Sequence, residues 1–426
     1  MRNEKTRTKE YLTNSSASLK ANKQTKLNPD TDNSNTIENV LVLQGGGSLG
    51  AFGCGVFKAI SNYNIKLDIT AGTSIGGINA AIIAGSKDEE HPEKSLERFW
   101  LELSESFVDL DHIFSPPSSD SIPGKKNSHS NIHLQNYDMK MRQVRSFYSS
   151  AVFGNDKMFR PRWRHETVFS DPEFLTPQNW TYLYDHTPLV NTLENYIDYD
   201  KLRPNGKPNP RLILTAVNVL NAEPITFDSS REQISPKHIL ATSAYPLYNF
   251  KWVEVEKGVY CWDGGLLSNT PLREVIDASP VIDKRIFLVE NYPKKVDSLP
   301  KSLPEVHHRA RDIMFSDKTK HSIAMSKVIT MYLKYIDELY QLIEDYTDLS
   351  KIDQDQLNKI RYKYKKIKRE RGAEIKDILY ITRDEPYPHI YENADFSPQT
   401  IKASIKEGEM KSTEILNRKM GFKSRV

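Results

Sequence analysis

The sequence predicts an α/β fold with a mainly parallel central sheet flanked by helices, followed by a mostly helical C-terminal extension. Two short apolar runs, residues 38–43 and 67–71, support this prediction. Each stops at a glycine-containing turn and is followed by a helix-like segment. Strands that alternate with helices in this way are joined by crossover connections, which place successive strands parallel in one sheet.

The composition is typical of a globular chain, with 426 residues of which 38% are hydrophobic and 27% charged. A net charge of +3 is too small to indicate a nucleic-acid partner, and no apolar run has transmembrane length. Cys54 and Cys261 form no disulfide framework, and no Cys/His cluster has the spacing of a zinc site. We therefore expect no metal and no cofactor.

Residues 1–37 are polar and rich in Lys, Asn, Thr and Ser, which predicts a disordered tail. The first residues include basic side chains but no following apolar segment, which argues against a cleaved secretory signal. We expect a cytoplasmic protein or one bound peripherally to a membrane. The sequence leaves non-classical secretion and homo-oligomerisation open.

The rest of the chain alternates between helix-like and strand-like patterns. Helices are expected over residues 93–103, 188–196, 322–346 and 398–416, and strands over residues 212–217, 224–227, 285–290 and 378–382. Residues 253–262 alternate like antiparallel or edge strands. Eight basic residues between Lys359 and Arg371 predict either a solvated helix end or a contact with anionic lipid.

The segment Gly72-Thr73-Ser74-Ile75-Gly76 has the nucleophile-elbow pattern, a serine between glycines at a strand-to-helix turn. Such a turn presents the serine Oγ at the carboxyl edge of a sheet, and the two glycines let strand and helix approach closely. The same pentapeptide also occurs in tight turns without chemistry. Further motifs are therefore needed to identify Ser74 as a nucleophile.

Two motifs supply the other requirements of acyl transfer. Residues 45–50 form a glycine loop between a strand and a helix, where successive N–H groups can bind an anion. Asp263 follows an extended run and precedes Gly264 and Gly265, so its carboxylate can approach the end of another strand. Ser74 would be the nucleophile, Asp263 the base, and the glycine loop the oxyanion hole.

These three motifs resemble, in order, the signatures of the patatin-like phospholipases. Further segments resemble a bacterial branch of that family: residues 159–162, 184–189, 241–246 and 268–272. The resemblance implies a hydrolase domain over residues 38–295, with residues 296–426 as an extension packed on it or continuing it. Many members carry Arg or Lys where this chain has Leu49, so the head-group preference is not implied.

The resemblance implies hydrolysis of lipid acyl esters, at a membrane surface, by a Ser74–Asp263 dyad without a metal. The implied oxyanion hole comprises Gly45, Gly46, Gly47 and Ile75, and the implied supporting glycines are Gly50, Gly72, Gly76, Gly264 and Gly265. An aromatic segment, residues 147–169, is expected to form a lid or acyl pocket, or else an irregular packed connection.

Three alternatives remain on the residues alone. Gly45, Gly47 and Gly50 also satisfy a dinucleotide-binding fingerprint, although the next strand lacks the acidic residue expected at its end. A catalytically silent lipid-binding protein could keep the same fold. A triad hydrolase would need a histidine base after Asp263, and its candidates, His307, His308 and His321, are expected outside the core. His186 and His238 are expected to make local hydrogen bonds.

Overall fold

A computed structural model describes residues 37–106, 144–164, 174, 176–206, 210–278, 280–316, 319–346, 353–370, 372–385 and 392–421. The chain divides into residues 1–36 and residues 37–426, and the second unit is described here. The predicted N-terminal tail therefore lies, except for Ile37, outside the described residues. Phe169, at the end of the aromatic segment, lies outside them too.

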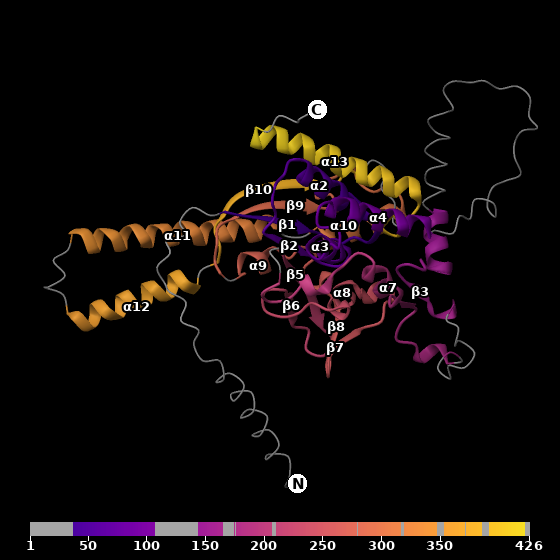
Figure 1. Ribbon diagram of the computed structural model, residues 1–426, viewed down its shortest axis with the longest axis horizontal. Helices are drawn as coiled ribbons and strands as arrows, with labels where there is room; N and C mark the ends of the chain where they lie inside the picture. The colour runs from indigo at the N-terminus through magenta and orange to yellow at the C-terminus, as the bar shows by residue number, and fades with distance from the viewer. Residues whose placement is uncertain are drawn as a thin grey trace, which may run out of the picture. The chain divides into compact units, whose positions relative to one another are not determined.

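Eight strands of the described residues form one sheet, whose main path runs β10–β9–β1–β2–β5–β8–β7 with β6 also paired to β5 (Figure 1). The strands are β1 Glu38–Leu43, β2 Ile69–Gly72, β5 Arg211–Asn218, β6 Pro224–Asp228, β7 Val253–Glu256, β8 Val259–Asp263, β9 Lys284–Glu290 and β10 Ile375–Thr382. The five strands from β10 to β5 are parallel, whereas β6, β7 and β8 pair antiparallel. The predicted mainly parallel α/β sheet is confirmed.

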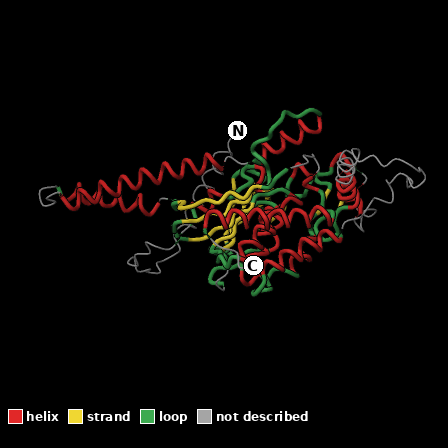
Figure 2. The backbone as a smooth tube through the Cα atoms, turned by 90° about the horizontal axis from the view of Figure 1, so that it is seen from above, coloured by secondary structure: helices red, strands yellow, loops and turns green. Residues whose placement is uncertain are grey.

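Helices pack on this sheet or extend from it (Figure 2). They are α2 Ala51–Asn62, α3 Ile75–Ala84, α4 Pro92–Glu105, α7 Pro188–Glu194, α8 Pro236–Ser243, α9 Leu272–Ile276, α10 Leu303–Phe315, α11 Thr319–Tyr346, α12 Gln354–Glu370 and α13 Pro398–Met420. Residues 144–153 are also helical. Most predicted helices and strands are present, with ends shifted by a few residues.

The parallel strands β1, β2, β5 and β9 are buried on both faces. In β1, Val40 and Val42 belong to one apolar cluster, whereas Leu41 and Leu43 belong to another. This separation follows from the two-residue period of a strand, which directs alternate side chains to opposite faces. The near-continuous apolar run of β1 is thus the pattern of a strand covered on both sides.

Strand register places Ser74 near Asp263. Gly72 of β2 pairs with Leu214 of β5, and two residues further along β5, Ala216 pairs with Asp263 of β8. The part of β5 that pairs with β6 overlaps the parts that pair with β2 and with β8, so β6 lies on the other side of β5. β2 and β8 therefore lie end to end along one side of β5. Ser74, two residues beyond Gly72, therefore lies next to the end of β8, where Asp263 is located.

The C-terminal region continues the core that is built around the sheet. β10 adds a parallel strand to β9 at the edge of the sheet, and α13 packs along α2 (Figure 1). Short helix η10, Glu392–Ala394, contacts η1, Gly47–Gly50, in the glycine loop. Residues after 296 are therefore part of the structure that surrounds the candidate site.

Helices α11 and α12 form an antiparallel pair next to the sheet. The rings of Tyr340 and Tyr364 stack at 3.9 Å, and Arg361 forms an ion pair with Glu344. Near its start, α11 buries Ile323 against the sheet, whereas most of its later apolar side chains are exposed. Among the helices described, none is both long and apolar enough to cross a lipid bilayer.

Candidate active site

Ser74 lies at a strained turn between β2 and α3. Its backbone has φ 57° and ψ −131°, a conformation that side-chain-bearing residues rarely adopt. The turn is held because the Ser74 N–H donates to the carbonyl oxygen of Thr242, at 3.0 Å, and to its Oγ1, at 3.2 Å. A Cβ on Gly72 would overlap the backbone of Gly76 across the elbow, and a Cβ on Gly76 would overlap the Leu43 carbonyl at the end of β1, so both positions require glycine.

Asp263 is buried beside Ser74, with 1% of its surface exposed. Its Oδ1 accepts a hydrogen bond from the Gly265 N–H at 2.7 Å, whereas Oδ2 has no partner of normal hydrogen-bond geometry among the described residues. Burial raises the pKa of Asp263 to about 7, although the nearby Ser74 hydroxyl and the Gly265 N–H act in the opposite direction. A buried carboxylate with one oxygen available next to a serine can act as a proton acceptor.

The glycine loop presents N–H groups next to Ser74. Within the described part of the chain, the backbone N–H groups of Gly46, Gly47 and Ile75 make no hydrogen bond. The Gly45 N–H, in contrast, donates to the Asn269 carbonyl at 3.3 Å and is not available as a donor. Gly45 instead provides space, since a Cβ there would stand 2.9 Å from the Ser74 Cβ.

Amide side chains hold the carbonyl groups of the glycine loop. Asn291 Nδ2 donates to the carbonyls of Gln44 and Gly45, at 2.9 and 3.1 Å, and the Asn291 N–H donates to Gln44 Oε1 at 2.7 Å. Asn269 Nδ2 donates to the Phe315 carbonyl at 3.3 Å. Because these hydrogen bonds fix the carbonyl groups on the side away from the cavity, the loop can direct its N–H groups toward the cavity that contains Ser74.

A cavity of about 520 Å³ opens over these residues, and both Ser74 and Asp263 line it. Its walls are mostly apolar and aromatic. Phe159 contacts Tyr184 and Phe250 edge to face, with ring centroids 5.6 and 5.5 Å apart. Phe147 and Met158 also line the cavity, so part of the aromatic segment forms a pocket wall, whereas Trp163 is 39% exposed outside it.

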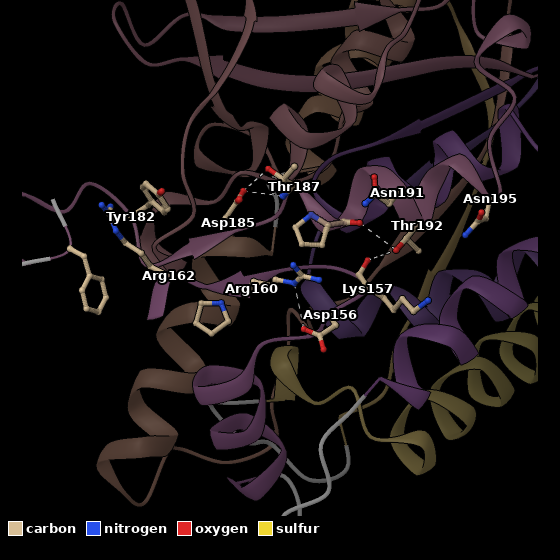
Figure 3. Close-up of a pocket in the computed structure, with 13 residues that line it drawn as sticks. Asp156, Lys157, Arg160, Arg162, Tyr182, Asp185, Thr187, Asn191, Thr192 and Asn195 are labelled. Atoms are coloured by element: carbon tan, nitrogen blue, oxygen red, sulfur yellow. Dashed lines mark hydrogen bonds and ion pairs between the residues drawn. The ribbon is translucent and has the colours of Figure 1, made fainter. Parts of the chain in front are cut away.

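A second cavity, of about 570 Å³, contains neither Ser74 nor Asp263 (Figure 3). It is polar and includes Lys157, Arg160 and Asp185 in its lining. The ladder of β3, Arg160–Pro161, with β4, Tyr184–Asp185, separates the two cavities. Alternation along β4 places Tyr184 in the apolar cavity and Asp185 in the polar one, so the cavity over Ser74 is the one suited to an acyl chain.

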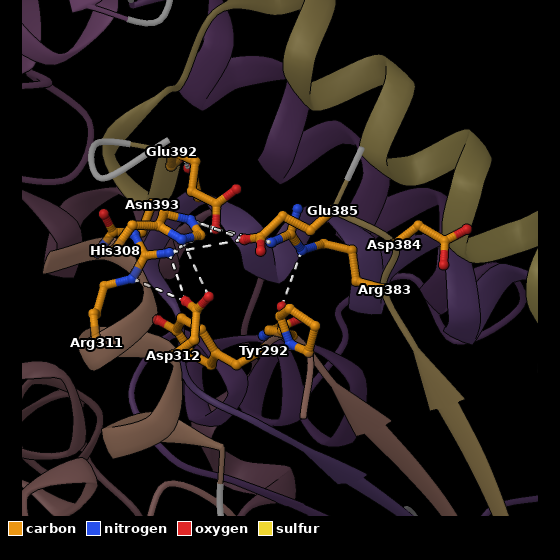
Figure 4. Close-up of polar contacts among 12 residues, drawn as sticks. Tyr292, His308, Arg311, Asp312, Arg383, Asp384, Glu385, Glu392 and Asn393 are labelled. Carbon is orange, nitrogen blue, oxygen red and sulfur yellow. Dashed lines mark hydrogen bonds and ion pairs between the residues drawn. The ribbon is translucent and has the colours of Figure 1, made fainter. Parts of the chain in front are cut away.

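A buried ionic cluster lies behind the glycine loop (Figure 4). It joins residues of α10 to residues that follow β10: His308, Arg311 and Asp312 with Arg383, Glu385 and Glu392. Arg311 bridges Asp312, at 2.9 Å, and Glu392, at 2.8 Å. The guanidinium of Arg311 also lies over the ring of Tyr292, 5.5 Å from its centroid.

Four members of the ionic cluster, His308, Asp312, Glu385 and Glu392, have the residue types and proximity of a metal site. Burial lowers the pKa of His308, but the carboxylates of Glu385 and Glu392, at 3.0 and 3.5 Å from its Nε2, outweigh it and raise the pKa to about 9. Protonated His308 and the two arginines thus place three cationic groups against three carboxylates. A metal ion would have to approach between these cations, so the donor set does not fit one.

The ionic cluster is connected to the glycine loop through η10. Ser48 Oγ donates to the carbonyl oxygen of Glu392 at 2.8 Å, and the Asn393 carbonyl packs against Gly47. Tyr292, which is 2% exposed, lies next to Gly46. The position of the predicted oxyanion donors therefore depends on residues more than 300 positions away in sequence.

Some histidines lie in the environments expected from the sequence, and one does not. His308 is 3% exposed within the ionic cluster, so its expected place outside the core is wrong: neighbouring charges compensate the cost of burying it. His307 is exposed and lines the apolar cavity. His186 and His238 make the expected local hydrogen bonds, to the Leu240 carbonyl and from the Ser235 N–H. The His321 side chain lies outside the part of the chain described.

The dinucleotide-binding alternative is not compatible with the strand ends. Asp68, the acidic residue near the second strand, accepts a hydrogen bond from the Asn39 N–H at 2.9 Å, at the beginning of β2. A ribose-binding acid would lie at the other end of the strand. That end carries Thr73, whose hydroxyl bonds to Thr215 at 2.7 Å, followed by Ser74.

The structure places the predicted central residues around one cavity, and sequence reasoning missed several of their neighbours. Ser74, Asp263, Gly46, Gly47 and Ile75 all line one cavity. The predicted supporting glycines also lie at close contacts: a Cβ on Gly50 would stand 2.7 Å from the Ile75 Cγ1, and one on Gly264 would stand 2.5 Å from Thr215 Oγ1. The missed residues are Gln44, Thr242, Asn269, Asn291 and the ionic cluster. A signal existed only for Thr242 and Asn269, which lie in matched family segments, and for the four-residue spacing of His308 and Asp312.

A scan against protein families matches residues 41–276, more than half of the chain, to the family described as patatin-like phospholipase. No curated protein matches the chain. Among solved structures, VipD from Legionella pneumophila is 15% identical, with a TM-score of 0.35, and the match covers 95% of this chain and 73% of VipD. The ExoU–SpcU complex from Pseudomonas aeruginosa is 13% identical, with a TM-score of 0.32, covering 91% of this chain and 52% of that one.

Proposed function

Because the chain belongs to the patatin-like phospholipase family, we propose that it is a lipid acyl hydrolase with Ser74 as nucleophile and Asp263 as base. The observation that carries this proposal is the buried Asp263 carboxylate, whose Oδ2 has no partner in the described structure and which lies beside the strained Ser74. Neither oxygen of Asp263 bonds to a described histidine, which supports a dyad over a triad.

In the proposed mechanism, Ser74 Oγ attacks the ester carbonyl carbon while Asp263 Oδ2 takes the hydroxyl proton. The carbonyl oxygen becomes an oxyanion, which accepts hydrogen bonds from the N–H groups of Gly46, Gly47 and Ile75. The N-terminus of α3 adds its dipole at the same place. Collapse breaks the ester bond, and the leaving alcohol takes the proton from Asp263, which leaves an acyl group on Ser74.

In the second half of the cycle, Asp263 removes a proton from water, and the hydroxide attacks the acyl-Ser74 carbonyl. Collapse of the new tetrahedral intermediate releases the fatty acid, and Asp263 returns its proton to Ser74 Oγ, which regenerates the carboxylate. The apolar cavity provides space for the acyl chain next to the nucleophile. We propose that the substrate is taken from the surface of a membrane, with phospholipids or lysolipids as the first classes to test.

The test is release of acyl chains from mixed lipids, measured by mass spectrometry, together with labelling by a fluorophosphonate probe. Ser74→Ala should lose about 10³-fold or more of the activity and all labelling. Ser243→Ala is the matched control, because Ser243 lines the same cavity and its hydroxyl donates, within the part of the chain that is described, only to carbonyls of its own helix. Labelling that persists in Ser74→Ala would place the nucleophile elsewhere. A wild-type protein that binds lipid but releases no acyl chain would favour the silent lipid-binding alternative.

A further inference from the structure

Helix α11 carries an exposed apolar surface that no described part of the chain covers. Asp337, Tyr340 and Glu344 contact α12 and recur on one side of α11. Eleven large apolar side chains are exposed on the rest of the helix: Met325, Val328, Ile329, Met331, Tyr332, Tyr335, Ile336, Leu339, Leu342, Ile343 and Tyr346. Tyr332 and Tyr335 are 60% and 58% exposed.

These apolar residues form one continuous stripe. At about 100° of rotation per residue, the eleven side chains fall within an arc of about 160° that excludes the residues in contact with α12. Between residues 324 and 346, no charged or polar side chain falls in that arc. Isolated exposed apolar residues are common on proteins, but an uninterrupted stripe along six helical turns marks an interaction surface.

Helix α12 extends the apolar stripe and adds positive charge to its border. Ile360 and Ile367, which are 50% and 41% exposed, lie seven residues apart and therefore on one flank of α12. The antiparallel pairing of Tyr340 with Tyr364 puts this flank on the same side as Ile336 and Ile343. Exposed lysines at positions 359, 363 and 366 follow the outer edge of that flank.

We propose that the α11–α12 hairpin is a docking surface for membranes that contain anionic lipids. An apolar stripe bordered by lysines, with several tyrosines within it, has the chemistry of a helix that lies in the interface between head groups and acyl chains. The lysine stems can extend to the phosphates while the isoleucines enter the apolar layer. Charge complementarity favours an anionic bilayer over an apolar protein partner, which would leave the lysine border unmatched.

Vesicle co-sedimentation of the Ser74→Ala protein tests the proposal, because this variant should not hydrolyse the vesicle lipids during the measurement. Vesicles of phosphatidylcholine with 30% phosphatidylserine are compared with pure phosphatidylcholine, each at low and high salt. The hairpin variant Ile329→Ser/Ile336→Ser/Ile343→Ser should lower the partition coefficient at least tenfold on both vesicles. The control variant Leu220→Ser/Leu299→Ser/Met410→Ser removes three exposed apolar side chains elsewhere and should leave it unchanged.

A second pair of variants tests the charged border. Lys359→Glu/Lys363→Glu/Lys366→Glu should lower binding to the phosphatidylserine vesicles at least tenfold and remove its salt dependence, with little effect on pure phosphatidylcholine. Lys237→Glu/Lys257→Glu/Lys402→Glu makes the same change in net charge at other exposed positions and should bind as the parent does.

Two results would overturn the proposal. One is equal vesicle binding by the hairpin variants and their controls. The other is a parent protein that is dimeric by analytical ultracentrifugation and becomes monomeric in the isoleucine variant without a change in lipid binding, which would assign the stripe to a second copy of the chain. With Ser74 intact, the hairpin variants should still hydrolyse a soluble ester at the parent rate. Loss of docking is thereby distinguished from failure of the proposed hydrolase.

Discussion

The carbonyl oxygen of Asn393 packs against the α-carbon of Gly47 and occupies the position that a side chain would need. Gly47 has φ 60°, so its conformation is also one that glycine adopts most readily. Asn393 comes from the C-terminal region, whereas Gly47 is a proposed oxyanion donor. The contact therefore makes residues beyond 296 part of the support of the active site rather than a separate appendage.

We expect Gly47→Ala to lower kcat for a soluble ester by about 10²-fold or more, because the methyl group would displace either the loop or η10. Loss of a single oxyanion donor has effects of this size. The matched control is Gly258→Ala. Gly258 has φ 80°, so an alanine there has the same kind of backbone strain, but no atom of the described residues lies within 4 Å of its Cβ position.

Steady-state kinetics together with thermal melting distinguish the two contributions. If Gly47→Ala and Gly258→Ala lose similar stability and only the first loses activity, the contact with Asn393 positions the oxyanion hole. Unchanged turnover in Gly47→Ala would remove Gly47 from the proposed donors.

The ionic cluster should make stability depend on pH above neutrality. The pKa of His308 is raised to about 9 in the folded protein, whereas its pKa in the unfolded chain is about 6.5. The stability that the His308 charge contributes is therefore fully present below about pH 6.5 and is lost as the pH rises through 9. We expect His308→Gln to cost about 3–5 kcal/mol near pH 6, as for other broken buried pairs, and less at pH 9.5. Urea unfolding across this range measures the difference.

His91→Gln is the control for the His308 experiment, because the His91 side chain is 48% exposed and, among the described residues, forms an ion pair with Glu93 alone. A wild-type stability that does not fall between pH 6.5 and 9.5 relative to His308→Gln would show that His308 is not charged in the folded protein. Activity of His308→Gln at pH 7 should fall as well, since Glu392 carries the carbonyl that Ser48 Oγ contacts.

Much of the fold could be predicted because its signals are local. An apolar run ended by glycine predicted β1, and the elbow glycines around Ser74 predicted the turn into α3. Asp263 could be matched to Ser74 because each lies at the end of an extended run and is followed by glycine. The structure brings them together because β2 and β8 run in opposite directions along one side of β5, so their carboxyl ends face each other.

The remaining contacts depend on chain segments whose proximity has no local signal. His308 lies in a polar stretch, and polar stretches are usually exposed. Its burial depends on Arg383 and Glu392, which sequence alone does not bring close. The side chains of Asn269 and Asn291 likewise act on the glycine loop across more than 200 residues. Burial that is compensated by distant charges or amides is visible only once the topology is known.

The dyad predicts that no imidazole is essential. His307 is the strictest test, because it lines the cavity that contains Ser74 and follows Asp263 in sequence. We expect His307→Gln to keep soluble-ester activity within about tenfold of the parent, and His186→Gln to do the same if the protein remains folded. A folded His307→Gln protein without activity, combined with substantial activity in Asp263→Asn, would favour a histidine-dependent triad.

The pKa of Asp263 makes a prediction for both activity and stability. Since only the ionised carboxylate accepts the Ser74 proton, kcat/KM should rise with pH and level off above a midpoint near 7. The stability of the folded protein should change with pH in the opposite direction to the activity. The folded pKa is raised above the unfolded value of about 4, so the unfolded state releases the proton first, and folding loses stability as the pH rises from about 4 to 7.

Asp263→Asn separates these two effects, because the amide keeps a similar shape and does not ionise. We expect it to lose about as much activity as Ser74→Ala at every pH, since no other described group lies in the position of the base. It should also be more stable than the wild type at pH 8, by on the order of 2–4 kcal/mol, with the difference disappearing near pH 4. Urea unfolding at the two pH values checks the stability, and soluble-ester kinetics check the activity.

An Asp263→Asn protein that is inactive but no more stable than the wild type at pH 8 would show that the carboxylate ionises at an ordinary pKa. In that case the pH midpoint of activity should fall well below 7, which the wild-type profile would reveal independently.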